Sequence, residues 1–303
     1  MDNSYKDQLY NLERTMKYLF MEIDHIKISQ GKILSELNKK KNSKNIQDYE
    51  FKIFSQWGED GIIQKIIDSI EIKNKTFIEF GVGNFLESNC RFLMMHNNWS
   101  GFVIDSSEKM IEMLKRAYFY WKYNLKSINA FIYKENINNL LLKSEFNFDL
   151  GLLSIDIDGN DYYILEAISQ YKPRILVVEY NSLFGSKRNI SIPYTPDFNR
   201  TKANYSNLYF GASLGAITYI AKKKGYILVG SNSSGVNAFY VRKDLMNKKL
   251  NEKSVKEAYT ISKLRESRDE SGKLSYLAEE KRLKAIKGTE VFNVINKKKK
   301  FCK

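Results

Sequence analysis

The chain has 303 residues, of which 43% are apolar and 28% are charged, and its formal net charge is +14. That length and apolar content allow a large packed core, and 3 prolines argue against a Pro-rich disordered chain. The 2 isolated cysteines and 2 distant histidines exclude a disulfide framework and a Cys-based zinc site, and they argue against a Ser-His-Asp triad.

The positive charge is concentrated at the two ends. Residues 1–45 carry a net +3, residues 46–245 a net +2, and residues 246–303 a net +9. A near-neutral middle argues against nucleic acid as a partner. The final "NKKKKFCK" is expected to be a solvated tail, with weak attraction to an anionic membrane surface as the alternative. Free cysteines, a polar start and no membrane-length apolar run predict a cytoplasmic protein, with peripheral contact at the inner membrane face if the tail binds lipid.

The first segment, 1–45, is predicted to be one long helix followed by a linker. Apolar residues, with Gln30 as the one polar exception, recur at alternating spacings of three and four and so form a heptad seam along one side of the helix. The heptad seam consists of Leu9, Leu12, Met16, Leu19, Ile23, Ile26, Gln30, Ile33 and Leu37. The pattern favours a coiled coil that makes the protein a homo-oligomer through residues 9–37, with Gln30 fixing the register. A helix packed on its own domain is the alternative.

The middle segment, 46–245, alternates strand and helix signals. This is typical of a doubly wound α/β sheet. Predicted strands cover 76–80, 101–105, 127–133, 150–156, 174–180, 226–231 and 237–242, and a helix covers 211–225. The short "NSSGV" between the last two strands favours an antiparallel hairpin. The third segment, 246–303, is predicted to be a charged, broadly helical extension.

Two features at the first strands suggest a nucleoside site. "EFGVGN" follows the strand at 76–80, and glycines there allow the backbone to approach a ligand. Asp105 ends the next strand, where an acid can bind ribose hydroxyls. The alternative for the glycine motif is an ordinary tight turn, and the alternative for Asp105 is a helix N-cap. The third glycine of a dinucleotide fingerprint is replaced by Leu86. This replacement weakens the case for an NAD-type oxidoreductase without excluding that class of enzyme.

These motifs resemble those of class I S-adenosylmethionine-dependent methyltransferases. More narrowly, "SQWGEDGIIQKI", "FIEFGVGNFLESNCRFL", "IDIDGNDYYILEAI" and "GVNAFYVR" resemble the bacterial FkbM-like family, many of whose members serve surface-polysaccharide or natural-product pathways. The resemblance covers residues 50–245 and implies a Rossmann-like, seven-stranded sheet with an antiparallel last strand. It implies S-adenosylmethionine contacts, and these are Glu79, Gly81, Gly83 and Asp105, with Gln56, Glu87, Ser88 and Asp156 as further candidates.

The stretch "DIDGNDY" is similar to one in cation-dependent catechol and caffeoyl O-methyltransferases, whose first aspartate binds a divalent ion. This resemblance, with the polar residues after the next strand, implies an Mg²⁺ or Mn²⁺ set of Asp156, Glu179 and Asn181. The family's lysine is absent, since Gly159 occupies its position. Asp158 or Asp161 is therefore expected to take the acceptor's proton. A turn with a helix cap at Asp161 is the alternative.

A long insert, 181–209, follows the strand at 174–180. It mixes aromatic residues with basic ones, and we expect it to cover a glycan acceptor, with or without phosphate. The sequence therefore predicts a methyltransferase acting on a sugar hydroxyl. The alternatives are an NAD-type oxidoreductase and a non-catalytic coiled-coil assembly protein with a degenerate nucleotide fold.

Overall fold

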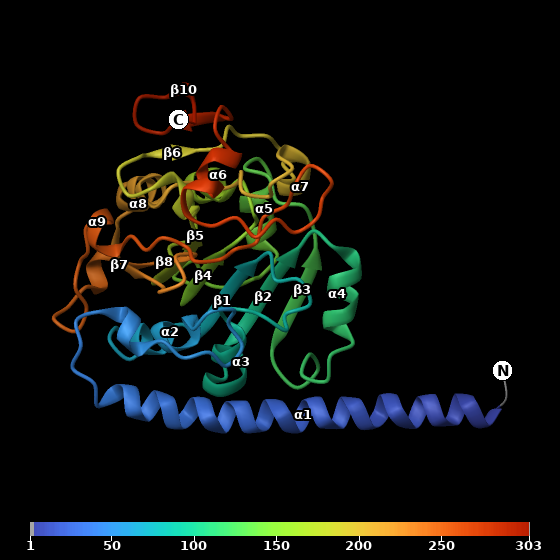
Figure 1. The fold of residues 1–303 in the computed structure, drawn as a ribbon. Coiled ribbons are helices and arrows are strands. Elements are labelled where there is room, and N and C mark those ends of the chain that lie inside the picture. The colour runs from blue at the N-terminus through green and yellow to red at the C-terminus, as the bar shows by residue number, and fades with distance from the viewer. Residues whose placement is uncertain (1–2, 303) are drawn as a thin grey trace.

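A seven-stranded sheet forms the centre of the molecule (Figure 1), and the computed structural model describes residues 3–302. The strand order is β3-β2-β1-β4-β5-β8-β7. The first five strands in sequence run parallel, and β8 is antiparallel to both of its neighbours. This is the Rossmann-like, seven-stranded arrangement with an antiparallel last strand that the sequence predicts, so this part of the predicted fold class is confirmed.

The elements of the sheet and its helices follow one another closely along the chain. The strands of this sheet are β1 Thr76–Phe80, β2 Ser100–Asp105, β3 Leu125–Asn129, β4 Leu152–Ile155, β5 Ile175–Glu179, β7 Tyr226–Ser231 and β8 Asn237–Arg242. The helices that accompany it are α2 Glu59–Ile67, α3 Arg91–Asn97, α4 Glu108–Lys115, α5 Ile137–Leu142, α6 Asp161–Ala167 and α8 Leu214–Lys223. Short 3-10 turns lie at Ile46–Tyr49, Ser182–Phe184 and Lys243–Leu245.

Both faces of the sheet are buried, as a parallel sheet requires. Side chains alternate along each strand, so Ile78 and Phe80 pack under α5, α6 and α8, whereas Phe77 packs under α2, α3 and α4. The two layers of helix leave the carboxyl ends of the strands free on one edge. Any ligand site of this fold is expected at that edge.

The last two strands of this sheet form the hairpin that the short connection predicts. β7 and β8 pair antiparallel, with an irregular register between Leu228 and Gly230. Gly230 has φ +152, and a Cβ there would lie 2.6 Å from Ile46. The hairpin therefore places β8 between β5 and β7, which closes that side of the sheet.

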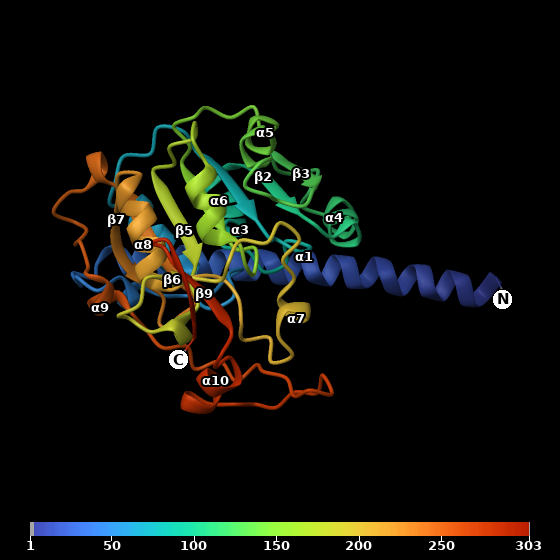
Figure 2. The same cartoon turned by 90° about the horizontal axis from the view of Figure 1, so that it is seen from above.

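The N-terminal segment is a single helix, α1 Asn3–Lys39. Its C-terminal half lies against the domain beside α2 and α3, and its N-terminal half extends beyond the body (Figures 1 and 2). Ile28 and Leu34 pack on the core under the sheet. The predicted long helix is confirmed.

The C-terminal segment is not the broadly helical extension that we expected. Its α-helices are short, α9 Val255–Ala258 and α10 Glu279–Ala285, and the rest is largely irregular. It instead contributes two strands to a small antiparallel sheet, in which β9 Glu290–Asn293 pairs with β6 Ile190–Ser191 of the insert and β10 Lys298–Phe301 pairs with β9. The reason is long-range, because Ile286 and Val291 are buried against Phe184 of the insert.

The terminal lysines belong to this second sheet. Lys298 to Lys300 lie on its edge strand with exposed side chains, so contact with an anionic membrane surface stays a prediction. Within residues 3–302, no helix combines the length and the apolar character needed to cross a membrane.

Candidate functional site

A cavity of about 480 Å³ opens at the carboxyl ends of β1, β2 and β4. That volume lies within the range of roughly 300–1,000 Å³ typical of small-molecule sites. Its lining comprises Gly81, Gly83, Ile104, Asp105, Ser106, Ala130, Phe131, Ile132, Asp156, Ile157, Asp158, Asn160, Phe198, Asn199, Arg200, Thr201, Asn207 and Glu266. The cavity is therefore apolar near β3 and polar near the insert.

The loop after β1 uses its two glycines for different reasons. Gly81 has φ +70, and a Cβ there would lie 1.7 Å from the Asp156 carbonyl oxygen, so the loop presses directly on the end of β4. Gly83 has φ +53, but a Cβ there would meet nothing within 4 Å. Gly81 is required for backbone packing, and Gly83 leaves open space beside the cavity.

Asp105, at the tip of β2, fixes this loop. One carboxylate oxygen accepts the Gly83 N–H at 2.7 Å, and the other accepts the Ser107 N–H at 2.7 Å. A carboxylate offers about four acceptor positions, so Asp105 keeps capacity for ligand hydroxyl groups. The helix cap of α4 is provided by Ser107, whose hydroxyl accepts the Met110 N–H.

Glu79 stabilises the same loop from below the cavity. Its carboxylate accepts the Ser88 hydroxyl at 2.5 Å and the backbone N–H groups of Asn89 and Cys90. Burial raises the pKa of Glu79 to about 7. Neither Glu79 nor Ser88 lines the cavity, so the structure places both behind the loop as supports.

Two further cofactor candidates lie away from the cavity. Gln56 is exposed, and Glu87 is an exposed residue 3.5 Å from Lys52. Of the predicted cofactor residues, the structure brings together four at the cavity, and these are Gly81, Gly83, Asp105 and Asp156.

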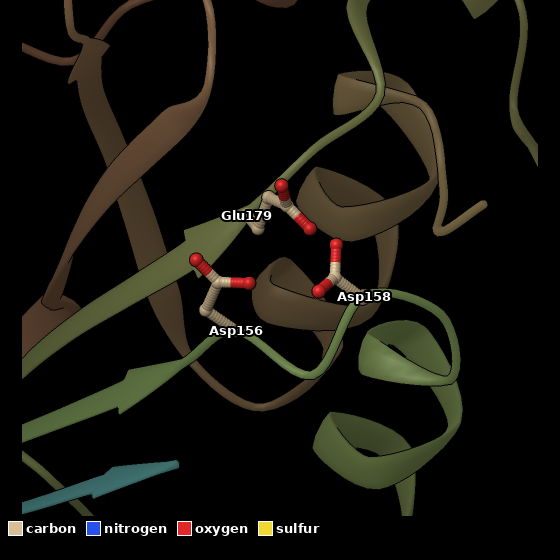
Figure 3. A group of neighbouring side chains, drawn as sticks. All are labelled: Asp156, Asp158 and Glu179. Carbon is tan, nitrogen blue, oxygen red and sulfur yellow. The ribbon is translucent and has the colours of Figure 1, made fainter. Parts of the chain in front are cut away.

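Three carboxylates gather where β4 and β5 end (Figure 3). The side chains of Asp156, Asp158 and Glu179 each have an oxygen within 4.8 Å of the others. The parallel pairing of Ile155 with Val178 brings the two strand ends together. Asp156 and Asp158 line the cavity, and Glu179 is buried beside them.

The electrostatics of this acidic cluster are unfavourable without compensation. Burial, and then the charges of Asp158 and Asp161, raise the pKa of Asp156 well above its usual value. Burial and the charge of Asp156 do the same to the pKa of Glu179. Among the described residues, Glu179 Oε2 has no hydrogen-bond partner. Such a cluster can hold a cation or a shared proton.

Arg200 supplies part of the compensating charge. Its Nη1 lies 2.6 Å from Asp158 Oδ1, and its guanidinium packs on the Phe210 ring at 3.8 Å. Asp158 has φ +55, which directs the turn after β4 toward the insert. The pair therefore joins the floor of the cavity to its cover.

Two residues that we predicted to accept a proton or to bind a metal ion instead make contacts that hold the backbone. Asp161 is fully buried and accepts the N–H groups of Ile157 and Gly159, and burial raises its pKa to about 6. Asn181 donates to the carbonyls of Leu208 and Phe210. Asn181 also accepts the Leu183 N–H.

These contacts correct two of our site predictions. The Asp161 carboxylate closes the turn before α6, and the Asn181 amide closes the turn after β5, so neither faces the cavity. The third carboxylate of the acidic cluster is Asp158, and the Asn181 side-chain oxygen already accepts the Leu183 N–H.

Sequence reasoning missed part of the lining. We assigned 127–133 to a strand, but β3 ends at Asn129, and the following residues Ala130 to Ile132 turn into the cavity. Their apolar character beyond a strand end was the available signal. No feature of the sequence marked Glu266 as a cavity residue, because it comes from the distant C-terminal segment.

Comparisons with known proteins show likeness in structure alone. No family model and no curated protein sequence matches the chain. A putative caffeoyl-CoA O-methyltransferase from Staphylococcus aureus has 12% identity and a TM-score of 0.42, covering 75% of this chain and 99% of that one. An S-adenosylmethionine-dependent methyltransferase from Clostridium acetobutylicum has 10% identity and a TM-score of 0.39, covering 60% and 89%. At these values the likeness carries no argument about function, which depends on the site.

Proposed function

We propose that the protein is an S-adenosylmethionine-dependent methyltransferase that methylates a hydroxyl group of a sugar or sugar-linked acceptor. The observation that supports this most is one cavity with two unlike halves. The half at Gly83, Asp105 and Phe131 suits a nucleoside. The half at Asp158 and Arg200 suits a polar acceptor.

The first half offers a contact for each part of adenosine. Asp105 has free acceptor positions for two ribose hydroxyls, and the loop at Gly83 leaves room beside it. Phe131 and Ile132 supply apolar surface for the purine ring. The positively charged sulfonium would then lie toward the acidic cluster, where the negative charge favours it.

The second half is lined by side chains that suit a ring rich in hydroxyl groups. Phe198 offers an aromatic face, and Asn207 and Glu266 offer hydrogen-bonding groups. Among the insert's basic residues at Lys187, Arg188, Arg200 and Lys202, Arg200 alone lines the cavity, and it is already paired with Asp158. A neutral sugar therefore fits better than a phosphate-bearing one. The FkbM-like resemblance is the reason for proposing an acceptor from surface-polysaccharide synthesis.

Methyl transfer requires alignment more than a nucleophilic residue. The acceptor oxygen displaces the sulfur at the methyl carbon, and the hydroxyl proton must leave. Asp156 and Asp158 line the cavity where that hydroxyl would lie, so we assign proton acceptance to one of these carboxylates. Arg200 holds Asp158 in place through its 2.6 Å contact.

A divalent ion is a separate part of the proposal. The oxygens of Asp156, Asp158 and Glu179 suit Mg²⁺ or Mn²⁺, and the unpartnered Glu179 Oε2 offers a ligand atom. Asp158 could contribute through the oxygen that Arg200 does not contact. When bound, the ion would lower the pKa of the acceptor hydroxyl.

Calorimetric titration with S-adenosylhomocysteine tests the proposed function. We expect the wild type to bind, and Asp105→Asn to bind at least tenfold more weakly. Asp158→Asn is the matched control, since it changes an acid on the acceptor side and should leave cofactor affinity within a few-fold. Wild type that binds NAD⁺ and not S-adenosylhomocysteine would establish the oxidoreductase alternative. Binding of neither ligand would favour the non-catalytic alternative.

A further inference from the structure

The heptad seam of α1 is exposed along its whole length. Its apolar members, from Leu9 to Leu37, have between 47 and 68% of their surface exposed. They are Leu9, Leu12, Met16, Leu19, Ile23, Ile26, Ile33 and Leu37. A continuous row of this kind is uncommon on the surface of a monomer.

The domain holds α1 by a different face. Asp24 forms a buried ion pair with Arg91 and accepts the Tyr118 hydroxyl at 2.6 Å, and Asn38 donates to the Tyr49 carbonyl at 2.7 Å. This face of the helix is therefore committed to the domain by polar contacts as well as by packing.

Gly31 lies on the same face and sets its distance from the domain. A Cβ there would lie 2.5 Å from the Phe92 ring, so the helix backbone touches the domain. Rotating α1 to bury the seam would break the Asp24 pair and separate this contact. The seam therefore cannot be covered by the chain's own domain.

The first half of the helix has no support from the domain at all. Residues 5–20 are exposed on every side and extend beyond the body (Figure 2). An isolated helix of about 15 residues is marginal in water, and this segment also exposes apolar side chains. A partner along the seam would supply the missing stabilisation.

We propose that the seam binds the same seam of a second copy as a parallel, two-stranded coiled coil. In the parallel arrangement Glu22 faces Lys27 of the second copy twice, and Gln30 meets its own counterpart. In a fully overlapped antiparallel arrangement Lys27 meets Glu13, but Glu22 meets Glu22, which is repulsive, and Gln30 faces the apolar Leu12. Charge complementarity thus selects the parallel orientation.

The number of helices in the coiled coil follows from the face of α1 that packs on the domain. Leu34 flanks the seam and packs on the core of its own domain, whereas Lys27 on the same flank is only partly buried, so its charge stays available to Glu22 of the second copy. Bundles of three or more helices bury a wider arc than the seam itself, and Leu34 already packs on the domain there. The isoleucines at Ile26 and Ile33 favour higher order from sequence alone, but the domain leaves room for one partner.

Multi-angle light scattering on the full chain tests the association. We expect twice the chain mass for the wild type and the single mass for the variant Leu19→Glu with Ile26→Glu. The control Tyr18→Glu with His25→Glu adds the same charge at exposed positions off the seam and should remain a dimer. A monomeric wild type, a trimer, or a seam variant that stays dimeric would overturn the proposal.

Disulfide trapping tests the orientation. Under mild oxidation, Leu12→Cys should link to itself in a parallel pair, because equal positions face each other. A mixture of Leu12→Cys and Gln30→Cys chains that forms the mixed disulfide and no self-linked Leu12→Cys dimer would show the antiparallel pair instead. The native Cys90 and Cys302 are buried and should not interfere. Glu22→Lys should weaken the dimer, and adding Lys27→Glu should restore it.

Discussion

Gly81→Ala should destabilise the protein far more than Gly83→Ala. Both glycines have positive φ, which costs an alanine about 1–2 kcal/mol in the left-handed region. At Gly81 the new Cβ would also lie 1.7 Å from the Asp156 carbonyl oxygen, and that oxygen is backbone. Contact at about 3.5 Å requires the loop and β4 to separate. Adding about 1 kcal/mol for each hydrogen bond disturbed gives a total near 3–5 kcal/mol for Gly81→Ala.

Urea denaturation followed by circular dichroism measures this difference. Gly83→Ala should lose only about 1–2 kcal/mol, because its Cβ meets no protein atom within 4 Å. Its methyl group would occupy space beside the cavity, so S-adenosylhomocysteine should bind more weakly to a protein that remains folded. Equal free energies of unfolding for the two variants would refute the reasoning from the close contact at Gly81.

Three further predictions follow from buried charges. Burial raises the pKa of Glu79 to about 7 from 4.5, so the folded state binds more protons between these values. The free energy of unfolding should therefore fall by up to about 3 kcal/mol as pH rises through that window, and urea titrations should show a flatter profile for Glu79→Gln. Asp24→Asn leaves the Arg91 cation buried and should cost about 3–5 kcal/mol by thermal denaturation, against less than about 1 kcal/mol for the exposed Glu36→Gln. EDTA should abolish methyl transfer and Mg²⁺ restore it if the acidic cluster binds an ion, and full activity in EDTA would exclude that ion.

The central sheet could be predicted from the sequence because its strands are short, apolar and bounded by turn residues. The predicted strands at 76–80, 226–231 and 237–242 match β1, β7 and β8 at both ends. The third strand was drawn too long, because apolar residues such as Phe131 and Ile132 continue past its end. Periodicity does not distinguish residues that complete a strand from residues that line a cavity.

The residues that we propose to bind the cofactor were easier to locate than those that we proposed for the chemistry. Gly81 and Gly83 come just after β1 and Asp105 ends β2, so local sequence positions them. From the sequence, Asp161 and Asn181 are candidates for the chemistry in the same way, because each follows a predicted strand. In the structure, nearby backbone groups bind their polar atoms. Glu266 and the Arg200–Asp158 pair depend on contacts between distant segments, which a single sequence does not show.

The smaller sheet has a consequence for the order in which the molecule is built during translation. β6 pairs with β9, which lies about one hundred residues later in the chain. The half of the cavity lined by Gly83, Asp105 and Phe131 can be complete once β8 has left the ribosome. The half lined by the insert and by Glu266 takes shape only after Glu266 has been synthesised. Under the proposed function, a nascent chain could therefore hold its cofactor before it can recognise an acceptor.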